Sequence, residues 1–336
     1  MNRIRTLPEI WFTGALLGLT LVIATSLGFR FHLPAGDRAA FVGIHYLYPL
    51  IGVAIWGILA FIGQRRELAS TFLIALPCYA IVLVCHFNLK LWGPHINPVM
   101  WDDFYWQTDM WLRPLIDACF ALRQAISPLI PLDSNFYMTA FIAMFYISFC
   151  FHALRSPHQF RTLFLAALIF QGVGALAYLV MPAIGPFIYE SGIEPLQTSA
   201  QASMLSVRDD IVNGGSSWIA ANGGTHITVG LAAMPSLHTG GSFLFLLFAW
   251  RYARVLLPLY LPLFAFISID AVASRWHYFI DLPAGVLLAL GCAWAAHKLH
   301  PSTDAESPLA NSPDMIGELF SKIQGKARQL MAKETV

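Results

Sequence analysis

Long apolar runs, separated by short polar or basic turns, fill the chain from its first residues to about residue 299. A helix needs about 20 apolar residues to cross a membrane, because each residue adds about 1.5 Å and the hydrocarbon core is about 30 Å thick. We find eight windows of this kind and therefore expect about eight transmembrane helices. They cover Ile10–Phe29, Ala39–Gly63, Leu68–Phe87, Phe136–Leu154, Thr162–Met181, Ile227–Trp250, Val255–Ala273 and Trp276–His297.

Basic residues in the turns predict how these helices are oriented, because Lys and Arg in short loops favour the cytoplasmic side. Arg3 and Arg5 precede the first expected helix, and alternate turns are basic as well. The basic residues of those turns are Arg65, Arg66, Arg155, Arg161, Arg251, Arg254 and Lys298. We therefore expect both termini in the cytoplasm and two long segments outside, 88–135 and 182–226.

Composition supports an integral membrane protein. Of the 336 residues, 57% are hydrophobic and only 12% are charged, whereas soluble domains carry about 25% charged residues. The formal net charge of +1 gives no support to nucleic-acid binding, which usually leaves a basic footprint. After residue 299 the chain becomes polar, and we expect residues 300–336 to be a cytoplasmic linker followed by an amphipathic helix, with a disordered tail as the equal alternative.

Two short motifs place histidines at the same expected outer face. "AAMPSLHTGGSF" contains His238 and enters the sixth expected helix, while "SRWHYFIDLPAG" contains His277 and Asp281 and enters the eighth. Residues four apart share a helix face, so Asp281 can accept a hydrogen bond from one nitrogen of His277. The other nitrogen is then left as a base or a nucleophile.

His238 is expected near the first turn of its helix, where free backbone N–H groups favour an anion. We expect a phosphate to bind there, beside Ser236 and Gly240, with His238 donating a proton to a leaving oxygen. A single histidine at a membrane interface is more often a hydrogen-bonding residue than a catalyst. The two motifs together are much more specific than either one.

Other charged residues in the outside segments have competing interpretations. Arg275 is the first choice for a further phosphate contact, since guanidinium suits bidentate phosphate recognition, and Arg113 is the next. Lys90 and Arg208 are the remaining outside cations. For Asp270 we favour an ion pair with Arg275 over a functional role.

An aromatic segment, "WDDFYWQTDMWLRP", resembles an interfacial belt. Its aspartates, Asp102, Asp103 and Asp109, are expected to form a solvated loop face, with binding of a polyol headgroup or a cation as the alternative.

The motifs Pro235–His238 and His277–Asp281 resemble the second and third signatures of the type 2 phosphatidic acid phosphatase (PAP2) superfamily. The resemblance implies an all-α membrane protein with a six-helix core, placed here at residues 68–299, with two additional helices within 1–67. It further implies that His277 is a nucleophile that forms a phosphohistidine, that Asp281 orients it and that His238 protonates the leaving group. No metal or cofactor is implied.

Two departures from the phosphatase pattern refine this expectation. The lysine expected seven residues before Arg113 is replaced by Trp106, and the arginine expected six residues before His277 is replaced by Ala271. The remaining pattern resembles the inositolphosphotransferase branch, which includes fungal inositol phosphorylceramide synthases. The segment "YLVMPAIGPFIY", Tyr178–Tyr189, is also similar to that branch.

We therefore predict transfer of a phospho-headgroup from a lipid phosphate to a lipid or polyol acceptor. The reaction would take place at the outer face of a bacterial inner membrane, or at the lumenal face of the Golgi or endoplasmic reticulum in a eukaryote. Two alternatives remain open: a PAP2-type lipid phosphate phosphatase, and a non-enzymatic transporter or lipid-binding scaffold. Nearly all charges lie near helix ends, which does not favour a transport pathway.

Overall fold

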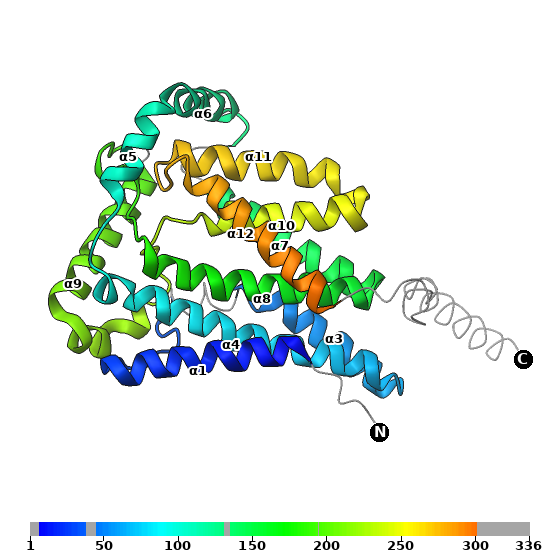
Figure 1. The fold of residues 1–336 in the computed structure, drawn as a ribbon. Helices are drawn as coiled ribbons and strands as arrows, with labels where there is room; N and C mark the ends of the chain where they lie inside the picture. The colour runs from blue at the N-terminus through cyan, green and yellow to red at the C-terminus, as the bar shows by residue number, and fades with distance from the viewer. Residues whose placement is uncertain (1–6, 38–44, 131–134, 194, 301–336) are drawn as a thin grey trace, which may run out of the picture.

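A computed structural model describes residues 7–37, 45–130, 135–193 and 195–300, and all regular structure in these ranges is helical (Figure 1). The α-helices are α1 (Pro8–Leu27), α3 (Tyr48–Ile62), α4 (Arg66–Ile96), α5 (Asp102–Trp111), α6 (Arg113–Ile126), α7 (Phe136–Arg155), α8 (Pro157–Val180), α9 (Pro195–His226), α10 (Leu237–Tyr252), α11 (Leu257–Ala273) and α12 (Asp281–Leu299). Two 3₁₀ turns, η1 (Pro186–Ile188) and η2 (Arg254–Leu256), complete the order. The predicted amphipathic tail helix lies outside the described residues.

Within the described residues, six helices are long and apolar enough to cross a membrane: α1, α4, α7, α8, α11 with the η2 turn before it, and α12. The helices α3 and α10 have 15 and 16 residues, which is shorter than a full crossing requires. The predicted all-helical membrane architecture is confirmed. The predicted count of eight membrane helices is not.

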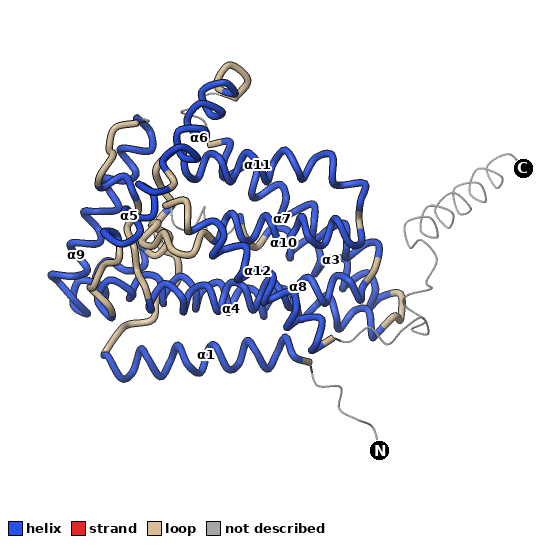
Figure 2. The backbone as a smooth tube through the Cα atoms, turned by 45° about the horizontal axis from the view of Figure 1, so that its top comes forward, coloured by secondary structure: helices blue, strands red, loops and turns tan. Residues whose placement is uncertain are grey.

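The helices form a bundle whose two ends differ (Figures 1 and 2). At its centre α8 packs against α4, α10 and α12, while α1 and α3 cover α4, and α6 covers α11. At one end the buried Glu9 of α1 pairs with Arg161 of α8 at 3.1 Å and with His300 after α12 at 3.0 Å. The helices α5, α6 and α9 lie at the opposite end.

Two helices begin later than their apolar windows predict. The helix α10 begins at Leu237 because Pro235 disfavours helical geometry just before it and Ser236 caps the new helix, accepting a hydrogen bond from the Thr239 amide at 3.5 Å. The helix α12 begins at Asp281, after an irregular loop in which Arg275 has a φ of +59°. Both starts lie at the end of the bundle that holds α5 and α9.

The two segments predicted to lie outside are largely helical. Residues 88–135 contain the end of α4 together with α5 and α6, and residues 182–226 contain η1 and α9. The helix α9 is interrupted at Gly215, whose φ of 56° lies in the left-handed region. These elements surround the loop between α11 and α12.

Candidate active site

The loop between α11 and α12, residues 274–280, carries His277 and is called the histidine loop below. His277 Nδ1 lies 3.2 Å from Asp281 Oδ2, and the same oxygen accepts a hydrogen bond from the Tyr278 amide at 3.0 Å. Asp281 is the first residue of α12 and is fully buried. The expected pairing is therefore present, but it is made across the turn that leads into α12 and not along a continuous helix.

Two glycines bring the starts of α10 and α12 into backbone contact. A Cβ atom on Gly240 would lie 2.4 Å from the Gly285 carbonyl oxygen, and one on Gly285 would lie 2.2 Å from the Ser236 carbonyl oxygen. The Ser236 amide also donates to the Asp281 carbonyl at 3.0 Å. This crossing places His238, the second residue of α10, beside the first turn of α12.

His238 and His277 line one cavity of about 550 Å³. The ring of His238 meets those of Tyr137 and Phe141 edge-on, with centroids 5.3 and 4.8 Å away. Further inside, the lining is mainly apolar and aromatic, and includes Leu83, Phe145, Ala167, Leu244 and Phe245. The cavity therefore combines the imidazoles of His238 and His277 with space suited to an apolar chain.

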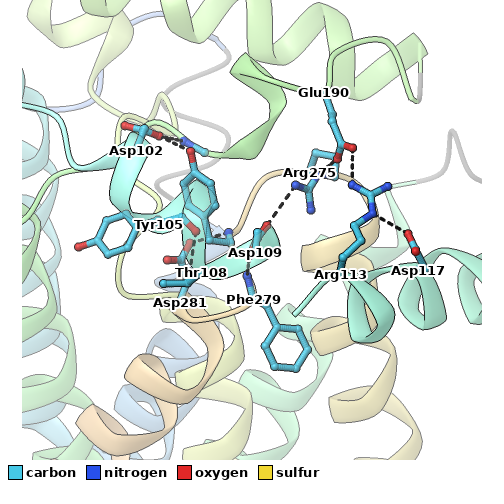
Figure 3. A network of polar contacts seen from close by, with 12 residues as sticks. Asp102, Tyr105, Thr108, Asp109, Arg113, Asp117, Glu190, Arg275, Phe279 and Asp281 are labelled. Atoms are coloured by element: carbon cyan, nitrogen blue, oxygen red, sulfur yellow. Dashed lines mark hydrogen bonds and ion pairs between the residues drawn. The ribbon is translucent and has the colours of Figure 1, made fainter. Parts of the chain in front are cut away.

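The helix α5 holds the histidine loop through Asp109 (Figure 3). This fully buried carboxylate accepts hydrogen bonds from Arg275 Nη2 at 3.1 Å and from the Phe279 amide at 2.8 Å. Burial raises the pKa of the Asp109 carboxyl, and the Phe279 amide and Arg275 oppose that rise. Arg275 Nε also lies 3.0 Å from Glu190 Oε2, and Glu190 pairs in turn with Arg113.

A second buried carboxylate of α5, Asp102, ties the loop to the segment that follows α8 (Figure 3). It accepts hydrogen bonds from the Tyr278 hydroxyl at 2.8 Å, the Ile184 amide at 3.0 Å and the Gly185 amide at 2.9 Å. Burial, reinforced by the charge of Asp102, raises the pKa of Tyr278 far above its ordinary value, so its hydroxyl stays a donor. Gly185 has a φ of 130°, and a Cβ there would lie 2.7 Å from the Trp276 carbonyl oxygen.

The helix α9 holds the loop from a further side. Gln201 donates to the Ser274 carbonyl at 2.9 Å, and Trp276 donates its indole N–H to Gln197. Contacts from α5, α9 and the segment around η1 therefore fix the loop on both sides of His277. Such support keeps a reactive imidazole in one orientation.

More than half of the chain matches a known protein family. Residues 116–295, from α6 into α12, match the family model of the PAP2 superfamily. The chain belongs to the PAP2 superfamily. Neither the curated proteins nor the solved structures contain a match. PAP2 proteins are generally lipid phosphatases or phosphotransferases, which supports an enzyme at the level of the family; the inositolphosphotransferase branch stays a prediction.

Within this PAP2 fold, the predicted phosphate-binding residues have structural partners. The Ser236 hydroxyl donates to Thr239 Oγ1 at 3.1 Å, and the Gly240 amide donates to the Ser236 carbonyl. Arg113 donates hydrogen bonds to Asp117 and Glu190. Arg113 and Asp109 lie on opposite sides of Arg275 (Figure 3). A phosphate contact by any of these residues stays a prediction. In the described ranges, no three His, Cys, Asp or Glu side chains are grouped so as to hold a metal ion.

Two expectations about aspartates are wrong. Asp270 pairs with Arg123 of α6 and not with Arg275, because the backbone turn at Arg275 directs that side chain toward α5. Asp102 and Asp109 are buried supports of the histidine loop and not a solvated face, whereas Asp103 is exposed. Their spacing is informative in retrospect: seven residues are two helical turns, so both carboxylates share a face with the buried Tyr105.

Proposed function

We propose that this PAP2 protein is a membrane phosphotransferase that moves a phospho-headgroup between lipid substrates through a phosphohistidine at His277. The observation that carries the proposal is the position of His277, bonded to Asp281 through Nδ1 while its ring lines the cavity that also contains His238. The hydrogen bond to a carboxylate places the proton on Nδ1 and leaves the lone pair on Nε2.

In the first step, Nε2 of His277 attacks the phosphorus atom of a lipid phosphate ester. The N–P bond forms as the P–O bond to the leaving group breaks, and His238 gives its proton to the departing oxygen. Asp281 stabilises the positive charge that develops on the imidazole of His277. In the second step, an acceptor hydroxyl loses its proton to His238 and attacks phosphorus, and the N–P bond breaks.

A lipid substrate is supported by the inner lining of the cavity, where aromatic and aliphatic side chains predominate. Transfer, as opposed to hydrolysis, is supported by the two departures from the phosphatase pattern, Trp106 and Ala271. The second candidate is a lipid phosphate phosphatase, in which water replaces the acceptor hydroxyl in the second step. A covalent phosphohistidine would exclude the third reading, a transporter or lipid-binding scaffold.

The test uses purified full-length protein and lipids labelled in the phosphate group: a phospholipid, a polyprenyl phosphate, and phosphatidylinositol with ceramide. We expect the wild type to form an acid-labile phosphoenzyme and His277→Ala to form none. Loss of acid–base catalysis should lower turnover by His238→Ala by about 10²- to 10⁴-fold. His297→Gln is the matched control, because His297 bonds Tyr252 away from the cavity and should retain activity.

The products distinguish transfer from hydrolysis. With a hydroxylated acceptor lipid present, we expect labelled phosphate in a new lipid. Release of the label only as inorganic phosphate, or as inositol phosphate from phosphatidylinositol, with and without the acceptor, would contradict the transferase. Full activity of both His277→Ala and His238→Ala would contradict the mechanism.

A further inference from the structure

One face of α4 lines the cavity from its inner part to its polar end. The residues on this face recur at helical spacing, namely Tyr79, Leu83, His86, Phe87 and Lys90. The helix runs toward the end of the bundle that holds the histidine loop (Figure 1). Lys90 is therefore the residue of this face nearest to that end, and Tyr79 lies about 16 Å deeper along the helix, since each residue rises about 1.5 Å.

Lys90 forms no ion pair or hydrogen bond with the described residues, and its ammonium nitrogen lies 5.2 Å from the centre of the Phe87 ring. The other ionisable groups that line the cavity are four histidines, His238 and His277 among them, four tyrosines and one aspartate. The acidic residue of the lining is Asp270, which is already paired with Arg123. The lining thus carries a cation without a counter-ion among the described residues.

A cation that lines a largely apolar cavity without a counter-ion carries a cost in free energy, and pairing with an opposite charge removes much of that cost. An anionic group entering this cavity would therefore be held more strongly than a neutral group of the same size. The space beyond Lys90 is apolar, so an anion that carries an apolar chain satisfies both parts of the lining.

We propose that Lys90 binds the anionic phosphate of a lipid whose apolar chain lies along the inner face of α4. The assignment rests on the proposed function for the identity of the anion. Lys90 lies on α4, before the residues 116–295 that match the family. The helix α4, outside the matched region, would thus supply a cation to the site. The chain has Trp106 at the position where the phosphatase pattern has its lysine.

Binding to full-length protein in detergent micelles tests this assignment without turnover if all variants carry His277→Ala. The probes are dioctanoyl phosphatidate, dioctanoylglycerol as its neutral counterpart, and inorganic phosphate. A charged hydrogen bond contributes about 10- to 100-fold in affinity, so Lys90→Met should weaken phosphatidate binding by that factor. It should leave dioctanoylglycerol binding within about twofold, which also shows that the cavity is intact.

Two further variants sharpen the result. Lys90→Arg keeps the charge and should restore most of the phosphatidate affinity. Arg254→Met is the matched control, because Arg254 lies in the η2 turn, does not line this cavity and bonds the Trp250 carbonyl. We expect its phosphatidate affinity to equal that of the protein with Lys90 and Arg254 unchanged.

Equal affinity of the Lys90→Met protein for phosphatidate, or an equal loss for phosphatidate and dioctanoylglycerol, would overturn the proposal. Inorganic phosphate binding as tightly as phosphatidate, with the same dependence on Lys90, would overturn the lipid as the source of the anion. If the wild type forms a phosphohistidine but Lys90→Met binds phosphatidate with unchanged affinity, the Lys90 subsite is contradicted and the proposed function is not. If phosphatidate binding depends on Lys90 but no phosphoenzyme forms, the proposed function is contradicted and the Lys90 subsite is not.

Discussion

Arg275 lies two residues before His277, and its side chain is fully buried between the carboxylates of Asp109 and Glu190. Its guanidinium also lies over the rings of Trp106 and Phe120, at 5.7 and 5.9 Å. A φ of +59° is unfavourable for a residue with a Cβ, and the ion pairs offset that cost. These contacts make Arg275 a positioning residue for the histidine loop.

Replacing Arg275 by glycine separates the effect of its ion pairs from the cost of its positive φ. Glycine accepts the positive φ, so Arg275→Gly removes the guanidinium without backbone strain. It leaves the buried carboxylate of Asp109 without a cation, whereas Glu190 keeps Arg113, and an unpaired buried charge typically costs about 3–5 kcal/mol. We expect a lower unfolding temperature in detergent and a lower kcat, because the loop that carries His277 loosens.

The double variant Arg275→Gly/Asp109→Asn is the control, since it also removes the charge that Arg275→Gly leaves unpaired. It should recover part of the lost stability, as residues in direct contact are not additive. A direct phosphate contact by Arg275 predicts a different pattern, namely a raised KM with unchanged unfolding temperature. That pattern would contradict the positioning role.

At the scale of elements, the crossing of α10 and α12 brings the two histidines together. Gly240 and Gly285 allow the two backbones to touch within the first turns, and the Ser236 amide bonds the Asp281 carbonyl across the crossing. His238 and Asp281 belong to these same first turns. The distance between the two imidazoles thus depends on how closely the helices approach.

Gly285→Ala should disrupt this crossing, because its Cβ would lie 2.2 Å from a backbone oxygen that cannot rotate away. A displacement of about 1 Å at reacting groups can cost about 100-fold in rate, and we expect a loss of that order in turnover. Gly291→Ala in the same helix is the matched control, since nothing lies within 4 Å of its Cβ. Equal turnover by the two variants would contradict the importance of the crossing.

The sequence predicts the long apolar helices well, because α1, α7, α8 and α11 are specified by local hydrophobicity. It misplaces the starts of α10 and α12. A proline and a capping serine lie within the apolar window of α10, and the loop that begins at the left-handed residue Arg275 extends into the window of α12. The sequence also predicts the pairing of His277 with Asp281, because the two residues are only four apart along the chain. The partners of Arg275 are not predictable in this way, since Asp109 is 166 residues away and reaches it only through the fold.

At the scale of the whole molecule, the two ends of the bundle differ in chemistry. The basic turns after α3, α7 and α10 lie at the end where α1 begins and α12 ends, and the histidine loop lies at the other end (Figure 1). Positive charge in loops favours the cytoplasmic side. We therefore predict that the histidine loop faces the periplasm or the lumen.

Cysteine labelling in intact cells tests this orientation in a background without native cysteines. Leu129 follows α6 at the end of the bundle that holds the histidine loop, and its side chain is 83% exposed. Leu299 is the last residue of α12, at the opposite end of the bundle, and is 55% exposed. A membrane-impermeant maleimide should label Leu129→Cys directly and Leu299→Cys only after permeabilisation. The reverse pattern would place the site in the cytoplasm.

The support that α5 gives to the histidine loop limits how this protein can be recombined with other members of its superfamily. Asp102 and Asp109 precede the matched residues 116–295, whereas the backbone and side chains that they bind lie within that range. The matched region is therefore not a self-sufficient module. A chimaera that joins this region to the front half of another PAP2 protein would keep both histidines but lose the carboxylates that shape the loop, unless α5 is transplanted with it.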